Sequence, residues 1–274
     1  MLGKLMKYDM KYMARILPWL YIGAFCLSLL CSVFFLFMPE GLLLEIGTMI
    51  ITYVGTLFVE TLVIMTVVFL IMRIYRSMFS DEGYLTFTLP VKNSTVINSK
   101  ILTGAIWTTF TVIVACIVSA MPSFAMSLRY AGTDVYDEII DFSEELNRYF
   151  GFNDLIMFAL IIIDVVVICF LIPSLYTFCA SVVHKAKRAR AFASIGMFVG
   201  ILYGIVVFLV AVFVIIAIIS EAYMLSYGSY EQLSGFMQNM YIIVPLIILV
   251  ITAPLTVFSW LMARRIVDKK LNML

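Results

Sequence analysis

Six apolar stretches in this chain are each long enough to cross a lipid bilayer as a helix, and they restrict its fold more than any other feature. About 20 apolar residues span the hydrocarbon core of a bilayer. The chain has 274 residues, of which 64% are hydrophobic and only 13% charged, about half the charged share of soluble domains. The stretches are Leu17–Met38, Ile46–Met72, Ile101–Met121, Leu155–Val183, Ala191–Ile219 and Tyr241–Met262. We therefore predict an all-α integral membrane protein with six transmembrane helices in a single domain, residues 1–274.

The positive charges predict the orientation of these helices. Sixteen of the eighteen lysines and arginines lie before the first stretch, between the second and third, between the fourth and fifth, or after the sixth. Cytoplasmic segments of membrane proteins carry the excess of Lys and Arg. Both termini are therefore predicted to be cytoplasmic, and residues 128–154 form an acidic external loop with seven acids against Arg129 and Arg148. Those acids either fill a surface depleted of cations or attract cationic molecules by their field.

The first 16 residues predict an amphipathic helix in the membrane interface rather than a signal peptide, because no short apolar region and small-residue cleavage site are present. Its cations, Lys4, Lys7, Lys11 and Arg15, recur at spacings of three and four and share one face. Apolar residues occupy the opposite face, as in helices that lie on lipid. Asp9 falls within that apolar face. It is interpreted either as a local partner of Lys or Tyr, or as a contact for a cytoplasmic subunit.

Residues 73–100 form the long polar interval on the predicted cytoplasmic side, around which the helices are organised. Asp81 and Glu82 lie there, directly before Gly83. The interval also contains aromatic and aliphatic residues that are too apolar for a freely solvated loop. The alternation of Leu85, Phe87 and Leu89 with threonines predicts an extended segment that ends at Pro90. This loop should pack on its own helices and the membrane, or on a partner.

Two acids lie within the apolar stretches: Glu60 in the second and Asp164 in the fourth. The six stretches contain no Lys or Arg, so neither acid has a cationic partner within them. Such acids face a bundle interior or a wet cavity because exposure to lipid is costly. We expect at least one of them to line a translocation cavity. The alternative is a neutral acid that bonds a neighbouring helix, with Thr56, Thr61 and Thr66 as company for Glu60.

Small residues at Gly196, Gly200 and Gly204 repeat every four positions in the fifth stretch. This spacing favours close helix packing within the chain or across a dimer. The interval Ser220–Met240, rich in Tyr, Gly and Ser, predicts an interfacial or re-entrant turn.

Groups for catalysis are missing from the sequence. His184 is the one histidine and begins a basic cluster, so it suits anchoring at anionic lipid better than chemistry. Convergent His, Cys and acidic ligands for a metal are absent, as is a phosphate-binding GxxxxGK[ST] loop. We expect no enzyme activity, no metal and no cofactor in this chain, and no nucleic-acid partner.

Two strings resemble a known family. FSDEGYLTFTLPV, Phe79–Val91, followed by Ser99 and Lys100, is similar to the first cytoplasmic loop of bacterial ABC-2 type transporter permeases. The opening MLGKLMKYDMK resembles the N-terminal elbow helix of these permeases, although Asp9 stands where Glu is expected. The six-span topology agrees with the family over the whole chain.

The resemblance implies a dimer of identical or paralogous permeases with two cytoplasmic ATPase subunits that bind ATP and Mg²⁺. A short coupling helix from the loop would dock on the ATPase. By position it would comprise Ser77, Met78, Phe79, Ser80, Asp81, Glu82, Gly83 and Tyr84. The expected location is a bacterial plasma membrane, in a Gram-positive organism. The expected function is export of a peptide, drug or lipid-like molecule. The alternatives are a sensor or immunity protein that binds a toxic peptide without moving it and, least favoured by the missing catalytic groups, a membrane enzyme.

Overall fold

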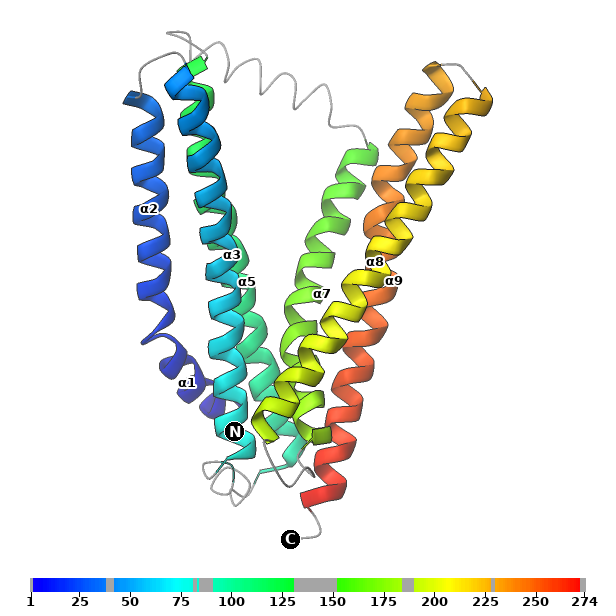
Figure 1. Ribbon diagram of the computed structural model, residues 1–274. Helices are drawn as coiled ribbons and strands as arrows, with labels where there is room; N and C mark the ends of the chain where they lie inside the picture. Colours follow the sequence, from blue (N-terminus) through cyan, green and yellow to red (C-terminus); the bar gives the residue numbers. More distant parts are fainter. Residues whose placement is uncertain are drawn as a thin grey trace. The chain divides into compact units, whose positions relative to one another are not determined.

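Within the residues that it describes, a computed structural model of the chain contains α-helices and no strands (Figure 1). The described residues are 2–37, 42–80, 83, 91–130, 152–183, 190–227 and 230–271. The helices are α1 (Leu2–Met13), α2 (Leu17–Phe37), α3 (Leu42–Phe79), α5 (Asn93–Tyr130), α7 (Phe152–Val183), α8 (Arg190–Tyr227) and α9 (Tyr230–Leu271). The prediction of an all-α fold is confirmed.

All six predicted membrane-spanning stretches are helical. Spans of sufficient length and hydropathy lie at Leu17–Phe37, Ile46–Phe79, Asn93–Ala125, Leu155–Val183, Arg190–Ile219 and Ile242–Lys269. The chain is therefore a multi-pass membrane protein. The acidic loop predicted at residues 128–154 lies largely outside the described residues, since 131–151 are not described.

Two predicted loops were too long. The polar interval was predicted at residues 73–100, yet α3 continues to Phe79 and α5 begins at Asn93. Apolar side chains explain the extension, because Ile74 and Met78 are four residues apart and both buried, as are Ile97 and Ile101. The turn predicted at Ser220–Met240 is also wrong over most of its length, since α8 continues to Tyr227 and α9 begins at Tyr230.

The chain divides into two compact units. One consists of Met1–Arg73 and Leu102–Tyr149, and the other of Ile74–Ile101 and Phe150–Leu274. The division falls inside α3, after Arg73, and inside α5, after Ile101. Each of these long helices therefore contributes to both units.

In the first unit, side-chain hydroxyl groups link α2 to α5. The Tyr21 hydroxyl lies 2.7 Å from Thr111 Oγ1, and Ser28 Oγ donates to the Val118 carbonyl at 2.6 Å. From the first pair to the second, the chain advances by seven residues in α2 and by seven in α5. The two helices therefore run parallel, and their contacts recur after one heptad. Spans one and three must share a direction in a chain that crosses a membrane back and forth. Thr111 Oγ1 also donates to Thr66 Oγ1 of α3 at 3.3 Å.

In the second unit, α7 packs mainly on α9 and to a smaller extent on α8. Ser259 of α9 donates to Ser174 of α7 at 2.9 Å, and Tyr176 of α7 meets Ser194 of α8 at 3.5 Å. The rings of Tyr176 and Phe198 pack edge to face, with centroids 5.6 Å apart. Satisfied hydroxyls and buried aromatic rings thus hold these three helices together.

Candidate functional site

A partly buried ion pair joins α1 to α3. Asp9 Oδ1 accepts from Arg73 Nε at 3.0 Å and lies 2.8 Å from Arg73 Nη2. The Asp9 residue is only 2% exposed. The Arg73 guanidinium also stacks over the ring of Tyr12, 4.5 Å from its centroid. Two donors from one guanidinium and an aromatic face fix α1 against α3.

The helix α1 has the two-faced character predicted from its sequence. Lys4, Lys7, Lys11 and Arg15 are all exposed, whereas Asp9 and Met13 are buried. The helix ends in a turn at residues 14–16, where the Ala14 amide still donates to the Met10 carbonyl at 2.8 Å. Asp9 bonds Arg73 of α3, a partner that neither interpretation named. Contact of Asp9 with a cytoplasmic subunit stays a prediction.

The predicted coupling residues begin inside α3. Ser77 and Met78 are buried in its last turns, and the ring of Phe79 packs against Tyr75 at 6.3 Å between centroids. Ser80 is exposed and is the surface position among these four residues. Asp81, Glu82 and Tyr84 lie outside the described residues, so their docking role stays a prediction.

Gly83 folds back onto the end of α3. Its amide donates to the Ser80 carbonyl at 2.7 Å. A Cβ at this position would lie 2.5 Å from the Met78 carbonyl oxygen and 2.7 Å from its carbon. Those atoms belong to the backbone and have no freedom to rotate away. The close approach therefore requires glycine here.

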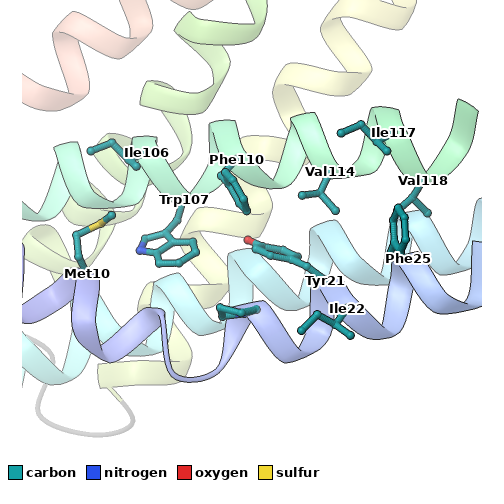
Figure 2. Close-up of a pocket in the computed structure, with 11 residues that line it drawn as sticks. Met10, Tyr21, Ile22, Phe25, Ile106, Trp107, Phe110, Val114, Ile117 and Val118 are labelled. Atoms are coloured by element: carbon teal, nitrogen blue, oxygen red, sulfur yellow. The ribbon is translucent and has the colours of Figure 1, made fainter.

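An apolar groove of about 600 Å³ runs between α2 and α5 and ends at α1 (Figure 2). Its floor is buried and consists of Tyr21, Trp107 and Val118. Its rim is 44–54% exposed and consists of Ile22, Phe25, Ile106, Phe110 and Ile117. Met10 closes the end that belongs to α1.

Aromatic rings from two helices form the centre of the groove. Figure 2 shows the ring of Tyr21 of α2 beside those of Trp107 and Phe110 of α5, with ring centroids 6.5 and 5.4 Å away. Trp107 and Phe110 meet edge to face at 6.2 Å. The indole Nε1 of Trp107 is buried and has no hydrogen-bond partner among the described residues. A groove of this size and lining suits an apolar ligand with one hydrogen-bond acceptor.

The two acids within the spans have different surroundings. Glu60 of α3, in the first unit, is exposed, and its neighbours Thr56 and Thr61 donate to backbone carbonyls of their own helix. Asp164 of α7, in the second unit, is buried, and its Oδ1 has no hydrogen-bond partner within the described residues. A carboxyl facing lipid is costly, so the face of Glu60 should meet water or another polypeptide. The cavity role of both acids stays a prediction.

The glycines of α8 lie on an open face. A Cβ built at Gly196, Gly200 or Gly204 meets no atom within 4 Å, apart from the helix's own backbone and sequence neighbours. Each of the three residues is exposed. Packing of this face stays a prediction, and only its openness in the described part of the chain is observed.

Among the described residues, no three His, Cys, Asp or Glu side chains come together in a way that could hold a metal ion. Comparison of the chain with protein-family models, with curated proteins and with solved structures finds no match. Function is therefore argued from the residues and their arrangement.

Sequence reasoning missed the groove and the Asp9–Arg73 pair. The groove had a detectable signal, because Trp107, Phe110, Val114 and Ile117 recur at helical spacing on one side of α5. That pattern also describes an ordinary core face, so it did not predict an open groove. For the ion pair, the sequence singled out only Asp9, as an acid on an apolar face. Arg73 lay in a segment that was predicted to be a loop.

Proposed function

We propose that this protein is the transmembrane permease subunit of an ATP-driven ABC exporter of the ABC-2 type. It moves a peptide, drug or lipid-like molecule out of the cell across a bacterial plasma membrane, in a Gram-positive organism. Energy comes from a separate ATPase subunit that binds ATP and Mg²⁺. A second permease, identical or paralogous, completes the assembly.

One observation carries the proposal: the string FSDEGYLTFTLPV begins at the last residue of α3, directly beyond the part of α3 that is tied to α1. The family resemblance assigns this string to the ATPase-coupling loop. Arg73 lies two turns before it and bonds Asp9. A push on the string would therefore act on the helix that, at Arg73, is bonded to the amphipathic helix α1. Such a link suits a loop that transmits force from a partner.

The experiment is a charge reversal of the predicted docking tip, Asp81→Lys with Glu82→Lys. The ATPase would be identified as the subunit that co-purifies with the unaltered permease, and co-purification and ATP-driven transport in vesicles would then be measured for the variant. We expect the variant to insert normally, to lose ATPase binding by roughly 30-fold or more, and to lose transport, because like charges at an interface cost several kcal/mol.

The matched control is Asp268→Lys. Asp268 is an exposed acid on the predicted cytoplasmic side, near the end of α9 and far along the chain from the coupling string. It should leave binding and transport unchanged. Normal transport by the double variant would refute the docking claim. Binding of a peptide with no transport by the unaltered protein would instead favour a sensor or immunity protein.

A further inference from the structure

The groove between α2 and α5 lies entirely within the first unit. Its floor is rigid because hydroxyl bonds on either side, Tyr21–Thr111 and Ser28–Val118, fix the two helices that make it. Its rim is half exposed and wholly apolar, so its open side matches the interior of a bilayer rather than water. A linear hydrocarbon chain fits a groove of this shape, lining and depth.

The end of the groove at α1 has a different chemistry. Met10 lines this end, and Lys7, three residues before it, lies next to it on the helix surface. Lys7 and Lys11 are exposed and one turn apart, and Arg15 precedes Pro18, which also lines the groove. Trp19 follows, 76% exposed, as is usual for tryptophans at a membrane interface. A positively charged surface therefore meets the end of an apolar groove.

The Trp107 indole adds a polar group at the same end. Figure 2 places its Nε1 on the side of the ring nearer to Met10. This N–H is buried and has no acceptor among the described residues, which is an unfavourable state for a donor. Met10 is an unbranched, flexible side chain and is the group that a ligand would displace to reach it. A carbonyl oxygen at this level would satisfy the indole.

We propose that the groove binds one anionic phospholipid from the surrounding leaflet. An acyl chain lies along the groove over Tyr21 and Val118, and an ester carbonyl accepts from Trp107 Nε1. The phosphate lies against Lys7 and Lys11. Basic helices at membrane surfaces prefer anionic lipids for this reason. This inference does not depend on transport or on an ATPase, and it concerns a lipid that stays bound rather than a molecule that is moved.

The experiment uses the full chain purified in detergent. Native mass spectrometry would count the lipids retained after addition of dioleoyl phosphatidylglycerol or dioleoyl phosphatidylcholine, which share acyl chains and differ in charge. We expect one phosphatidylglycerol per chain, retained at least about ten-fold more tightly than phosphatidylcholine, since each cation near the headgroup contributes a several-fold preference. Dihexanoyl phosphatidylglycerol should bind much more weakly because its chains leave the groove empty.

Three variants test the three contacts. Lys7→Gln with Lys11→Gln should remove the preference for phosphatidylglycerol, whereas Arg265→Gln with Lys269→Gln, exposed cations of α9, should not. Trp107→Phe should weaken retention of both dioleoyl lipids by roughly five-fold. Val114→Phe should fill the groove and abolish retention of both, and Val210→Phe, on an exposed face of α8, is its control.

The outcomes separate the lipid from other occupants. Equal binding of dihexanoyl and dioleoyl phosphatidylglycerol would mean that the cations hold a headgroup alone, and would overturn the proposal. So would retention that Val114→Phe leaves unchanged. If Val114→Phe alters the oligomeric state instead of lipid retention, a second copy of the chain covers the groove and the lipid assignment is wrong. Should Val114→Phe unfold, Val114→Leu supplies a smaller filling with a graded loss.

Discussion

Asp9 of α1 and Arg73 of α3 form an ion pair close to the end of a membrane-spanning helix. The Asp9 side chain is 3% exposed and that of Arg73 is 18% exposed, so water screens the pair weakly. Removing one partner of such a pair leaves the other desolvated, which is more costly than losing a surface ion pair. The pair is therefore expected to matter for the position of α1 more than the four exposed cations do.

We predict that Asp9→Ala lowers the free energy of unfolding by about 3 kcal/mol and releases α1 from α3, because Arg73 loses a charged acceptor in a buried site. Asp9→Asn should cost less, since it keeps one oxygen acceptor at the same place. Thermal unfolding in detergent and protease sensitivity of residues 2–13 measure these effects. Asp268→Ala, at an exposed acid of α9, is the control. A stability equal to that of the unaltered chain would show that the pair does not hold α1.

Gly83→Ala should open the turn after α3. The added methyl would meet the Met78 carbonyl at 2.5 Å, so the Gly83 amide must move away from Ser80. We expect hydrogen exchange of that amide to accelerate at least about five-fold, the loss of one ordinary hydrogen bond. Apart from the helix's own backbone and sequence neighbours, the methyl of Gly23→Ala meets no atom within 4 Å, so this variant should be silent. Unchanged exchange in Gly83→Ala would mean that the turn tolerates a side chain.

These two residues illustrate what a sequence can and cannot predict at single positions. Asp9 was conspicuous as an acid on an apolar face, but Arg73 is 64 residues away and its identity as the partner required the fold. Gly83 was noticed because it follows two acids. Its actual constraint is a backbone contact with Met78, which no local pattern encodes.

At the scale of elements, the six apolar helices were predictable because length and hydropathy determine them without any tertiary contact. The ends of α3 and α5 were not. Arg73, Arg76 and Lys100 suggested a loop, but helix continues through them. Arg76 is exposed, whereas Lys100 is buried, as are the apolar residues Ile74, Met78 and Ile97. Charge marks where the membrane ends and not where the helix ends.

The helix α7 carries a buried carboxyl whose Oδ1 lacks a partner in the described part of the chain. We predict that Asp164→Val raises the free energy of unfolding by about 1–2 kcal/mol, because an unsatisfied buried polar atom is removed. Ser174→Ala, which breaks the satisfied bond to Ser259, should lower it by about 1 kcal/mol. Thermal unfolding in detergent measures both. A loss of stability in Asp164→Val would mean that the carboxyl is bonded in the membrane. Lost transport together with gained stability would identify a functional acid.

For the whole molecule, the cation distribution predicts which ends of the helices face the cytoplasm. In a chain whose five native cysteines are replaced, we expect single cysteines at Lys92 and Ala186 to react with an impermeant maleimide only after permeabilisation. A cysteine at Asp141 should react in intact cells, because the acidic interval is predicted to be external. Labelling of Lys92→Cys from outside would reverse the orientation and remove the docking site from the cytoplasm.

The number of spans and their alternation could be predicted for the whole chain, since both follow from composition. Its division into two units could not, because the boundaries fall within the continuous helices α3 and α5 and depend on tertiary contacts. The groove also could not be predicted from the sequence. It exists because the large side chains of α2 and α5 meet at Tyr21 and Trp107 and leave space beside them, which depends on the register between two helices.

The two hydroxyl bonds between α2 and α5 also have a consequence for synthesis. Each joins residues 90 positions apart, so α2 enters the membrane well before its partner has been translated. At about 5–20 residues per second, the delay is roughly 5 to 20 s. During that time Tyr21 and Ser28 must bond lipid, water or their own backbone. The helix α2 therefore lacks its partner until α5 has been synthesised. The emergence of α5 sets the earliest moment at which the first unit can fold.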